Sequence, residues 1–243
     1  MAININEIYN ATITHYKRAR DTLVIKASQM VHESAAISDV IPGFQADKLE
    51  FGSYDRENFA VLFVDMRRST QRSETVGPDK TYLTMHVFLP ALLEVIKYHK
   101  GKVIDIMGDG LMVFWGGRKA RETDGMVKTQ AITSAGLCGR DMLIVRESVI
   151  NRIISEEGLG PTISIGIGVT FDSVIVTKIG IPGSYDVKAF GDCINIASKY
   201  ANNTENKVKV SKKVKNEWPT GKNGTIRFSS DDGGNSYFLE SSK

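Results

Sequence analysis

Apolar residues recur at steps of three and four along the first part of the chain, and this spacing predicts a helix over residues 7–33. Its apolar positions are Tyr9, Ile13, Tyr16, Leu23, Ala27 and Met30. A Pro-Gly step at 42–43 and a polar run over 52–58 follow, which is typical of a connecting segment. We therefore expect a helical N-terminal extension and linker over residues 1–54 and a main domain over 55–243.

Short apolar runs separated by turn residues predict the strands of the main domain. The expected strands are 59–64, 102–107, 111–115, 162–170, 173–179, 208–210, 225–228 and 237–240. Segments with helical spacing lie between them, at 81–100, 126–156, 192–201 and 212–218. Pro90 lies inside the first of these helices and predicts a kink or a break there, because proline lacks a backbone N–H. The alternation of strands and helices over 59–243 predicts a single α/β sandwich.

Length and composition narrow the classes of protein without selecting one. A chain of 243 residues suits one α/β domain with an extension, or at most two small domains. The net charge of +3 is too small to indicate nucleic-acid binding, and we expect no nucleic-acid partner. Neither the two cysteines nor the four histidines have the spacing of metal ligands. No apolar run is long enough for a membrane span and the N-terminus lacks a signal-peptide pattern, so we expect a cytoplasmic protein.

Two aspartates stand where strands of the main domain end. Asp65 directly follows the apolar run 59–64, and Asp109 lies at the tip of the hairpin between 102–107 and 111–115. Mg²⁺ prefers oxygen ligands and is usually held by one or two carboxylates together with substrate phosphates. The sequence is therefore compatible with a magnesium site at this edge of the sheet. The alternative is that each aspartate only forms a turn, and for Asp109, between two glycines, that alternative has equal weight.

The segment after Asp65 has the residue types of a phosphate-binding turn. Arg68, Ser69 and Thr70 precede an expected helix start, and backbone N–H groups at a helix N-terminus favour phosphate. The alternative is a capping Ser or Thr beside exposed arginines, which this segment alone does not exclude.

Three blocks of the chain together resemble the class III nucleotidyl cyclases, which include the adenylyl and guanylyl cyclases. The first block is FVDMRRST and the second is GKVIDIMGDGLMVFW, which is similar to the GDG hairpin of that family. The third is ISIGIGV followed by GSYDVKAFGDCINIASKY, which resembles a glycine-bearing strand and the helix after it. The blocks occur in the family order and cover residues 55 to 211. Each is weak alone, and their combination identifies the chain as a member of this family.

The resemblance implies a ferredoxin-like α/β (α+β) sandwich with an antiparallel-rich sheet flanked by helices, and a metal-dependent active site. Asp65, Asp109 and the Met66 carbonyl fall on the family's ligands for two divalent ions, Mg²⁺ or Mn²⁺. Asn195 falls on the asparagine that orients the ribose, and Lys199 on the position of an arginine that binds the α-phosphate. Lysine keeps the charge of that arginine but lacks its bidentate fork, which leaves the role of Lys199 open. The C-terminal segment does not match the region of the family's late lysine for the terminal phosphates, for which Lys207, Lys209 and Arg227 are candidates. Because the family assembles each site from two chains, the resemblance implies a homodimer.

The expected base pocket departs from the adenylyl and guanylyl patterns. Asp105 stands where adenylyl cyclases carry lysine, and Lys188 stands where they carry Asp or Thr; guanylyl cyclases have Glu and Cys there. A carboxylate only accepts hydrogen bonds and an ammonium only donates them. Uracil, with one N–H between two carbonyls, suits such a pair, and guanine suits it nearly as well; cytosine and adenine can also be made to fit. The alternative is that Asp105 and Lys188 pair with each other and leave the base to other groups.

A short cyclase with a helical N-terminal extension and this pocket looks like the pyrimidine cyclases of the bacterial antiphage system called Pycsar. That resemblance implies conversion of UTP, before CTP, to a cyclic monophosphate such as cUMP, which acts on a separate effector protein. The alternatives are a cytidylate, guanylate or adenylate cyclase in other signalling, and a non-catalytic cyclase-like regulatory module, which Lys199 favours weakly. A diguanylate cyclase is disfavoured because the hairpin reads MGDGL and not GGDEF.

Overall fold

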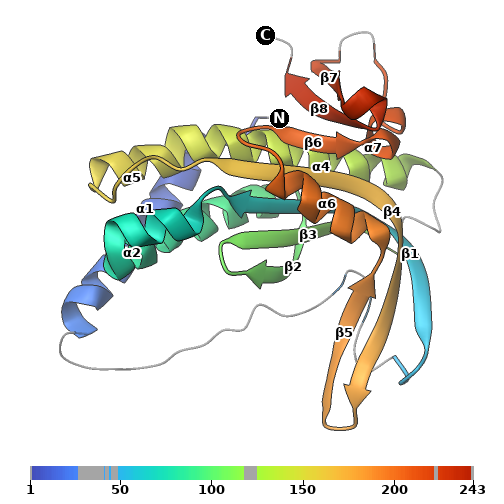
Figure 1. Cartoon of the computed structure of the whole chain (residues 1–243), viewed down its shortest axis with the longest axis horizontal. Helices are drawn as coiled ribbons and strands as arrows, with labels where there is room; N and C mark the ends of the chain where they lie inside the picture. Colours follow the sequence, from blue (N-terminus) through green and yellow to red (C-terminus); the bar gives the residue numbers. More distant parts are fainter. Residues whose placement is uncertain are drawn as a thin grey trace.

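An eight-stranded sheet forms the centre of the protein, in a computed structural model that describes residues 2–26, 41, 44, 49–117, 125–221 and 224–241. The strands are β1 (Tyr54–Met66), β2 (Lys102–Met107), β3 (Gly110–Gly116), β4 (Ile165–Ile181), β5 (Ser184–Phe190), β6 (Val208–Ser211), β7 (Ile226–Asp231) and β8 (Ser236–Ser241). Their order is β2-β3-β1-β4-β6-β8-β7, and β5 pairs with β4 (Figure 1). β4 and β6 are parallel, whereas the other strand pairs of the described chain are antiparallel. The antiparallel-rich α/β sheet expected from the sequence is confirmed.

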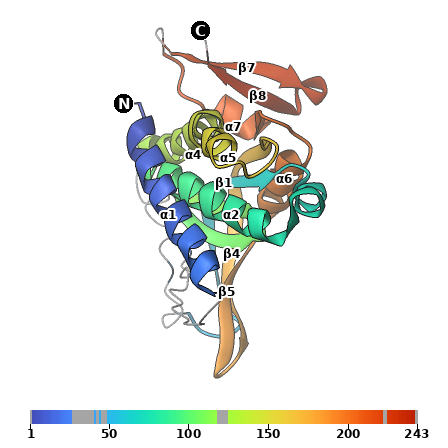
Figure 2. The same cartoon turned by 90° about the vertical axis from the view of Figure 1, so that its left-hand side faces the viewer.

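Helices lie on both faces of the sheet (Figures 1 and 2). They are α1 (Ile5–Lys26), α2 (Ser69–Tyr98), α4 (Gly125–Val145), a π-helical segment η2 (Arg146–Asn151), α5 (Arg152–Glu156), α6 (Asp192–Asn202), α7 (Lys212–Asn216) and a short 3₁₀ turn η3 (Asp232–Gly234). α2 and α4 share one face of the sheet, and α1 packs outside them against α2. α6 lies on the opposite face, over β4 and β1.

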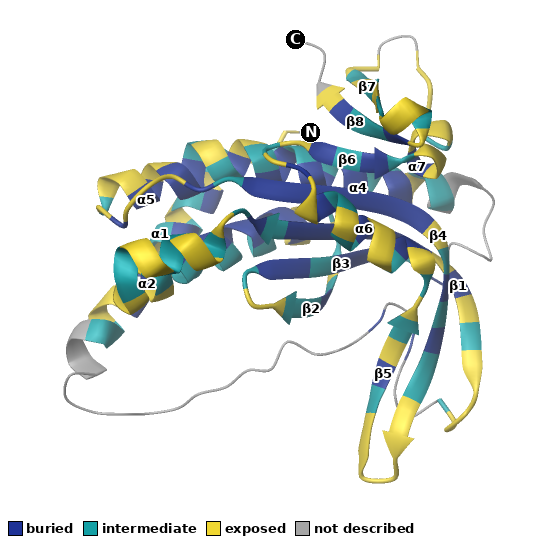
Figure 3. Cartoon of the chain, in the orientation of Figure 1, coloured by how far each residue is buried: buried dark blue, intermediate teal, exposed yellow. Residues whose placement is uncertain are grey.

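Alternation along β1 divides the interior into two cores. Ala60, Leu62, Val64 and Met66 face α2 and α4, while Phe59, Val61 and Phe63 face the side of α6. Successive strand residues point to opposite faces, and both faces are covered, so this run is apolar at every position. Figure 3 shows the buried middle of the sheet and the exposed outer part of the β4–β5 hairpin. By the same alternation, Asp65 belongs to the face that carries α6.

β4 differs from the sequence-based prediction, which placed separate strands at 162–170 and 173–179. The structure has one strand from Ile165 to Ile181, because Phe171, Asp172 and Ser173 continue the antiparallel pairing with β1. A long partner strand thus keeps an Asp-Ser step extended that in isolation favours a turn. The prediction also missed β5, which returns along β4 after the Pro-Gly step at 182–183.

α2 also differs from its prediction, which had a helix start after Thr70, a helix over 81–100 and a kink or a break at Pro90. The structure begins the helix at Ser69 and carries it through Pro90; the kink lies at Gly77. Proline removes one backbone hydrogen bond, but Val87, Phe88, Ala91 and Leu92 around it are fully buried, and their burial holds the helix together.

The N-terminal helix α1 is joined to the body by polar contacts as well as by its apolar side. Tyr9 donates a hydrogen bond to Glu156 (2.7 Å), and Tyr16 donates one to Glu157 (2.9 Å). α1 ends at Lys26 in the described chain, and the remainder of the helix predicted over 7–33 lies outside the described residues. Among the described helices, none combines the length and the hydropathy needed to cross a membrane.

Candidate active site

Asp65 and Asp109 are brought together by the pairing of β1 with β3. Asp65 is the penultimate residue of β1 and lies opposite Gly110, the first residue of β3, while Asp109 immediately precedes Gly110. A Cβ atom at Gly110 would lie 3.3 Å from Asp65 Oδ1, so the glycine leaves room for this carboxylate. Burial raises the pKa of the Asp65 carboxyl, and the negative charge of Asp109 raises it further. The two side chains therefore form one acidic site.

The electrostatics of this acidic site fit a bound cation. Asp109 Oδ2 is buried and has no hydrogen-bond partner among the described residues. A buried carboxylate oxygen without a partner carries an energetic cost that a positive ion would offset. No cluster of three or more His, Cys, Asp or Glu side chains occurs in the described part of the chain. A hard divalent ion held here would complete its shell with backbone carbonyls, water and substrate oxygens, as Mg²⁺ commonly does.

Arg67 is a neighbour of the acidic site that the sequence did not distinguish from Arg68. Its guanidinium forms an ion pair with Asp65, donates to the backbone carbonyl of Asn202, and donates to the Asn202 side-chain oxygen at 3.3 Å. The Arg67 charge lowers the pKa of Asp65 and so opposes the effects of burial and of Asp109. Arg67 thus connects the end of β1 to the C-terminal end of α6.

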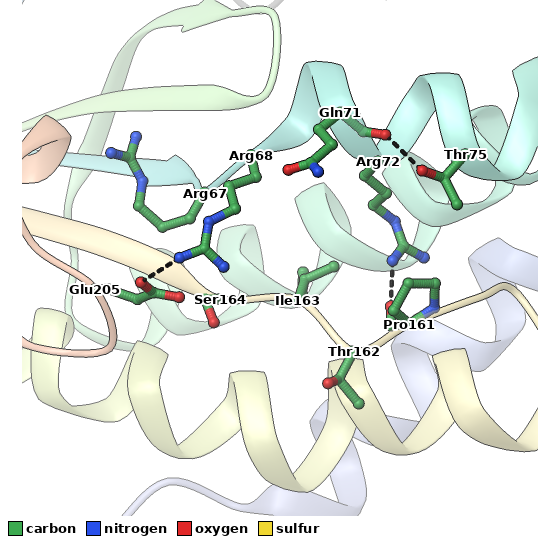
Figure 4. Close-up of a pocket in the computed structure, with 10 residues that line it drawn as sticks. All are labelled: Arg67, Arg68, Gln71, Arg72, Thr75, Pro161, Thr162, Ile163, Ser164 and Glu205. Atoms are coloured by element: carbon green, nitrogen blue, oxygen red, sulfur yellow. Dashed lines mark hydrogen bonds and ion pairs between the residues drawn. The ribbon is translucent and has the colours of Figure 1, made fainter.

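The residues expected to bind phosphate lie beside these carboxylates. Ser69 and Thr70 open α2 and, together with Met66 and Asp109, line a pocket of about 390 Å³. Arg68 is the residue before the helix and has a left-handed backbone (φ 58°), and no side chain caps this helix end. The Arg68 side chain points to the other side of the turn, where it forms an ion pair with Glu205 at 3.1 Å (Figure 4). The structure therefore places Ser69 and Thr70, but not the Arg68 guanidinium, on the side of Asp109.

α6 approaches the sheet unusually closely, and two glycines of β4 explain this. A Cβ atom at Gly166 would lie 1.9 Å from the Ala201 carbonyl oxygen, and one at Gly168 would lie 2.0 Å from the Ala197 carbonyl oxygen. Only glycine is compatible with such contacts. Since Asp65 lies opposite Gly166, the close approach brings the end of α6 next to the acidic site.

Asn195 and Lys199 lie on the exposed side of α6, opposite the buried Cys193, Ala197 and Ala201. They are four residues apart and therefore neighbours on one helix face. Arg67 contacts α6 at Asn202, about two turns beyond Asn195. Within one chain, Asn195 and Lys199 thus face outward, and the part of α6 that lies next to the acidic site is its C-terminal end, at Asn202.

The two residues expected to read the base lie on different strands. Asp105 is on β2 opposite Met112, whose side chain packs with the core on the α6 side. Lys188 is on β5 next to Val187, which is buried in that same core, so alternation places Lys188 on the other side of β5. Lys188 forms an ion pair with Asp186, with 2.5 Å between Nζ and Oδ2. Asp186 was missed in the sequence, although a spacing of two on a strand places both side chains on one side.

The chain is similar to known nucleotidyl cyclases in sequence and in fold. Residues 52–235 match the adenylate and guanylate cyclase catalytic domain. A cytidylate cyclase of Staphylococcus aureus is 26% identical over 157 residues, which cover 63% of this chain but only 36% of that protein. A uridylate cyclase of Gulbenkiania mobilis is 26% identical over 187 residues, covering 73% of this chain and 69% of that protein.

A solved structure supports the same assignment at the level of the fold. The adenylyl cyclase CyaB from P. aeruginosa superposes with a TM-score of 0.65 at 17% identity, covering 79% of this chain and 97% of that one. The matched part of the chain includes both aspartates, the first turn of α2 and all of α6. The chain belongs to the adenylate and guanylate cyclase catalytic domain family, the class III nucleotidyl cyclases.

Proposed function

We propose that this chain is a pyrimidine nucleotidyl cyclase that converts UTP, in preference to CTP, to the 3′,5′-cyclic monophosphate and pyrophosphate. The observation that carries the proposal is the acidic site itself. Asp109, whose buried oxygen has no hydrogen-bond partner among the described residues, lines the same pocket as the first turn of α2, and Asp65 lies opposite Gly110, the next residue after Asp109. In the reaction the ribose 3′-oxygen forms a bond to the α-phosphorus, the bond from that phosphorus to the bridging oxygen breaks, and the hydroxyl proton passes to solvent or phosphate.

Asp65, Asp109 and the Met66 carbonyl would hold two divalent ions, Mg²⁺ or Mn²⁺. Such ions lower the pKa of a bound hydroxyl and stabilise the charge of the leaving pyrophosphate. The first turn of α2 would bind the phosphates through its backbone N–H groups and the Ser69 and Thr70 hydroxyls. Arg68 contributes positive charge at longer range, because its guanidinium is turned toward Glu205.

We propose a homodimer with two equivalent sites, because Asn195 and Lys199 point away from the acidic site of their own chain. Asn195 of one chain would orient the ribose, and Lys199 would neutralise the α-phosphate, at the acidic site of the partner. The protruding β4–β5 hairpin supports this arrangement, since it exposes large apolar side chains to solvent. They are Ile179 (47% exposed), Ile181 (67%), Tyr185 (41%) and Phe190 (49%). An exposed apolar patch of this kind commonly marks a protein interface.

The pyrimidine assignment rests on the hydrogen-bonding capacity of Asp105 and on the relatives. Asp105 offers only acceptors, which suits the N3–H of uracil and not the N3 lone pair of cytosine. Lys188 donates to Asp186 and would present a remaining donor to a base carbonyl. Two relatives are named cytidylate cyclase and uridylate cyclase, and the uridylate cyclase is the one matched over two thirds of its own length. The resemblance of this chain's own sequence to the Pycsar antiphage cyclases supports a role in which the cyclic nucleotide activates a separate effector.

One experiment decides between these activities. The full chain is incubated with each of the four ribonucleoside triphosphates and Mn²⁺ or Mg²⁺, and the products are identified by mass spectrometry. We expect cUMP as the main product, cCMP as the second, and neither from Asp65→Asn or Asp109→Asn. Preference for ATP or GTP over both pyrimidines would refute the base assignment, and no cyclic product from any substrate would identify a non-catalytic module.

A further inference from the structure

α2 consists of two helical segments that meet at a single residue. Gly77 has φ 79° and ψ 171°, which is not helical, and Pro78 follows it. Residues 69–76, which we call the α2 arm, therefore form a separate segment of two turns ahead of the main helix. A Cβ atom at Gly77 would meet nothing within 4 Å, so the glycine serves the backbone conformation and not close packing.

The α2 arm has almost no apolar anchorage. The buried residues of α2 begin at Leu83, and no residue of the arm is buried. Val76 lies close to the turn that precedes β4, because a Cβ atom at Gly160 would lie 2.6 Å from Val76 Cγ1. A segment with few buried contacts opens at low free-energy cost unless polar contacts hold it. The position of the arm must therefore depend on its polar side chains.

Arg72 provides that polar contact. Its Nη2 donates to the Leu159 carbonyl at 3.0 Å and to the Thr84 hydroxyl at 3.3 Å, and its Nη1 donates to the Pro161 carbonyl. Figure 4 shows the guanidinium directed at the turn that leads into β4. Burial lowers the pKa of Arg72, which remains charged at neutral pH. One side chain thus joins the arm, the main helix and the turn between α5 and β4.

The same arm forms a wall of the acidic site. Ser69, Thr70 and Ser73 line the pocket of about 390 Å³ that contains Asp109, and Arg72 lies behind them in the same pocket. The turn that receives Arg72 is itself fixed to β1, since the Arg67 N–H donates to the Ser164 carbonyl at 2.8 Å. A change at Arg72 would therefore alter the separation between the first turn of the arm and the carboxylates while leaving the residues Ser69, Thr70, Asp65 and Asp109 themselves unchanged.

We propose that Arg72 is a positioning residue that holds the α2 arm in place, with Gly77 as the hinge. In this position Ser69 and Thr70 can contact the phosphates of a nucleotide bound at Asp65 and Asp109. We call this contact of Arg72 the latch. The proposal rests on the proposed cyclase function for the identity of the ligand, but not for the latch. The planar guanidinium of Arg72 donates hydrogen bonds to two backbone carbonyls and one hydroxyl at the same time. Lysine has the charge but not the fork, so it would keep only part of the contact.

Hydrogen–deuterium exchange of the full chain without nucleotide tests the latch directly. In Arg72→Ala and, less strongly, in Arg72→Lys we expect faster exchange over 69–76 and unchanged exchange over 83–96. Lys80→Ala is the matched control, because Lys80 donates to Gly158 of the same turn at 2.9 Å but lies beyond the hinge. It should leave the arm protected. Equal exchange over 69–76 in Arg72→Lys and wild type, or a uniform rise across α2, would overturn the latch.

Binding and kinetic measurements then test whether the latch affects phosphate binding and turnover. Inorganic triphosphate with Mn²⁺ is titrated into wild type, Arg72→Ala, Arg72→Lys and Lys80→Ala by calorimetry, and kcat and KM are measured with the nucleotide that wild type turns over best. We expect weaker triphosphate binding and a fall of roughly 10²-fold in kcat/KM for Arg72→Ala, partly restored in Arg72→Lys, since a misplacement of about 1 Å costs this much. Faster arm exchange with unchanged triphosphate binding would overturn the positioning role. Absence of turnover in wild type would refute the cyclase function, while the exchange result would still decide the latch.

Discussion

The Arg67 guanidinium forms an ion pair with Asp65, two residues earlier in the chain, and the same group donates to the Asn202 carbonyl at the end of α6. One cation thus joins the end of the central strand to the helix that covers it. Asp65 therefore has a positive charge beside it on its own chain, and a divalent ion at Asp65 must share this carboxylate with Arg67 or replace it.

Removal of this competing charge should strengthen metal binding. We expect Arg67→Gln to bind Mn²⁺ in the absence of nucleotide roughly two- to fivefold more tightly, because a partly exposed ion pair is worth up to about 1 kcal/mol. The Mn²⁺ signal in electron paramagnetic resonance measures this affinity. Arg68→Gln is the control, since it removes an equal charge that is paired with Glu205 instead. Weaker Mn²⁺ binding by Arg67→Gln would show that Arg67 supports the metal site and does not compete with it.

The raised pKa of Asp65 predicts a pH dependence of stability. Its folded-state pKa lies above the ordinary value of 3.8, because of burial and of the Asp109 charge, so the folded protein binds this proton more tightly than the unfolded chain does. The contribution of this group to stability is therefore present at low pH and is lost as pH rises from 3.8 through the folded-state pKa. Relative to wild type, Asp65→Asn should become more stable across that window. Urea unfolding of both proteins between pH 4 and 7 measures the difference, and a constant difference would contradict the shift.

The proposed homodimer predicts complementation between two inactive variants. Asp65→Asn removes the metal half of a site and Asn195→Ala removes the ribose half. Equal mixing after subunit exchange should restore about a quarter of wild-type activity, because half of the dimers are mixed and each mixed dimer has one intact site of two. The rate is measured against the mixing ratio. Failure to recover activity, with subunit exchange shown by mass spectrometry of mixed dimers, would place both halves of the site in one chain.

The proposed role of Asp105 predicts a change in base choice. Asp105→Asn introduces a donor while keeping the size of the side chain, so it should lower UTP turnover and shift relative use toward CTP. A site that hydrogen-bonds a substrate group can reject an analogue lacking that group by as much as roughly 10⁴-fold, and this value is the upper limit of the expected change in the UTP-to-CTP ratio. Competition between UTP and CTP in one reaction measures the ratio. Asp186→Asn, which weakens the ion pair between Asp186 and Lys188, separately tests the proposed contact of Lys188 with the base. An unchanged ratio in Asp105→Asn would remove Asp105 from the reading of the base.

The contact between α6 and β4 predicts a strict requirement for glycine. Gly166→Ala and Gly168→Ala would each place a methyl group about 2 Å from a backbone carbonyl of α6. Overpacking of this kind costs about 1–3 kcal/mol or more in unfolding free energy, and it should also displace Asn195 and Lys199. Gly221→Ala is the control, since a Cβ atom there meets nothing within 4 Å. Wild-type stability in Gly168→Ala would show that α6 moves away from the sheet without cost.

The sequence by itself determined the elements whose signals are local. The apolar run before Asp65, the hairpin around Asp109 and the helix from Asp192 follow from alternation, turn residues and helical spacing, and the structure has all three. The resemblance to class III cyclases also depends on contiguous segments, because each block contains a strand or helix together with the candidate functional residues at its end. For these reasons the sequence alone points to Asp65 and Asp109 as candidate metal ligands.

Only the tertiary structure decided the features that depend on partners distant in sequence. β4 is one strand because β1 pairs with it across Phe171, Asp172 and Ser173, and α2 continues through Pro90 because the residues beside the proline are buried in the core. The same holds for the site: Arg67 contacts α6, Lys188 pairs with Asp186, and Arg72 reaches carbonyls almost ninety residues away. Periodicity and spacing describe a residue relative to its neighbours in the chain. The direction of a long charged side chain depends instead on which segments the fold brings beside it.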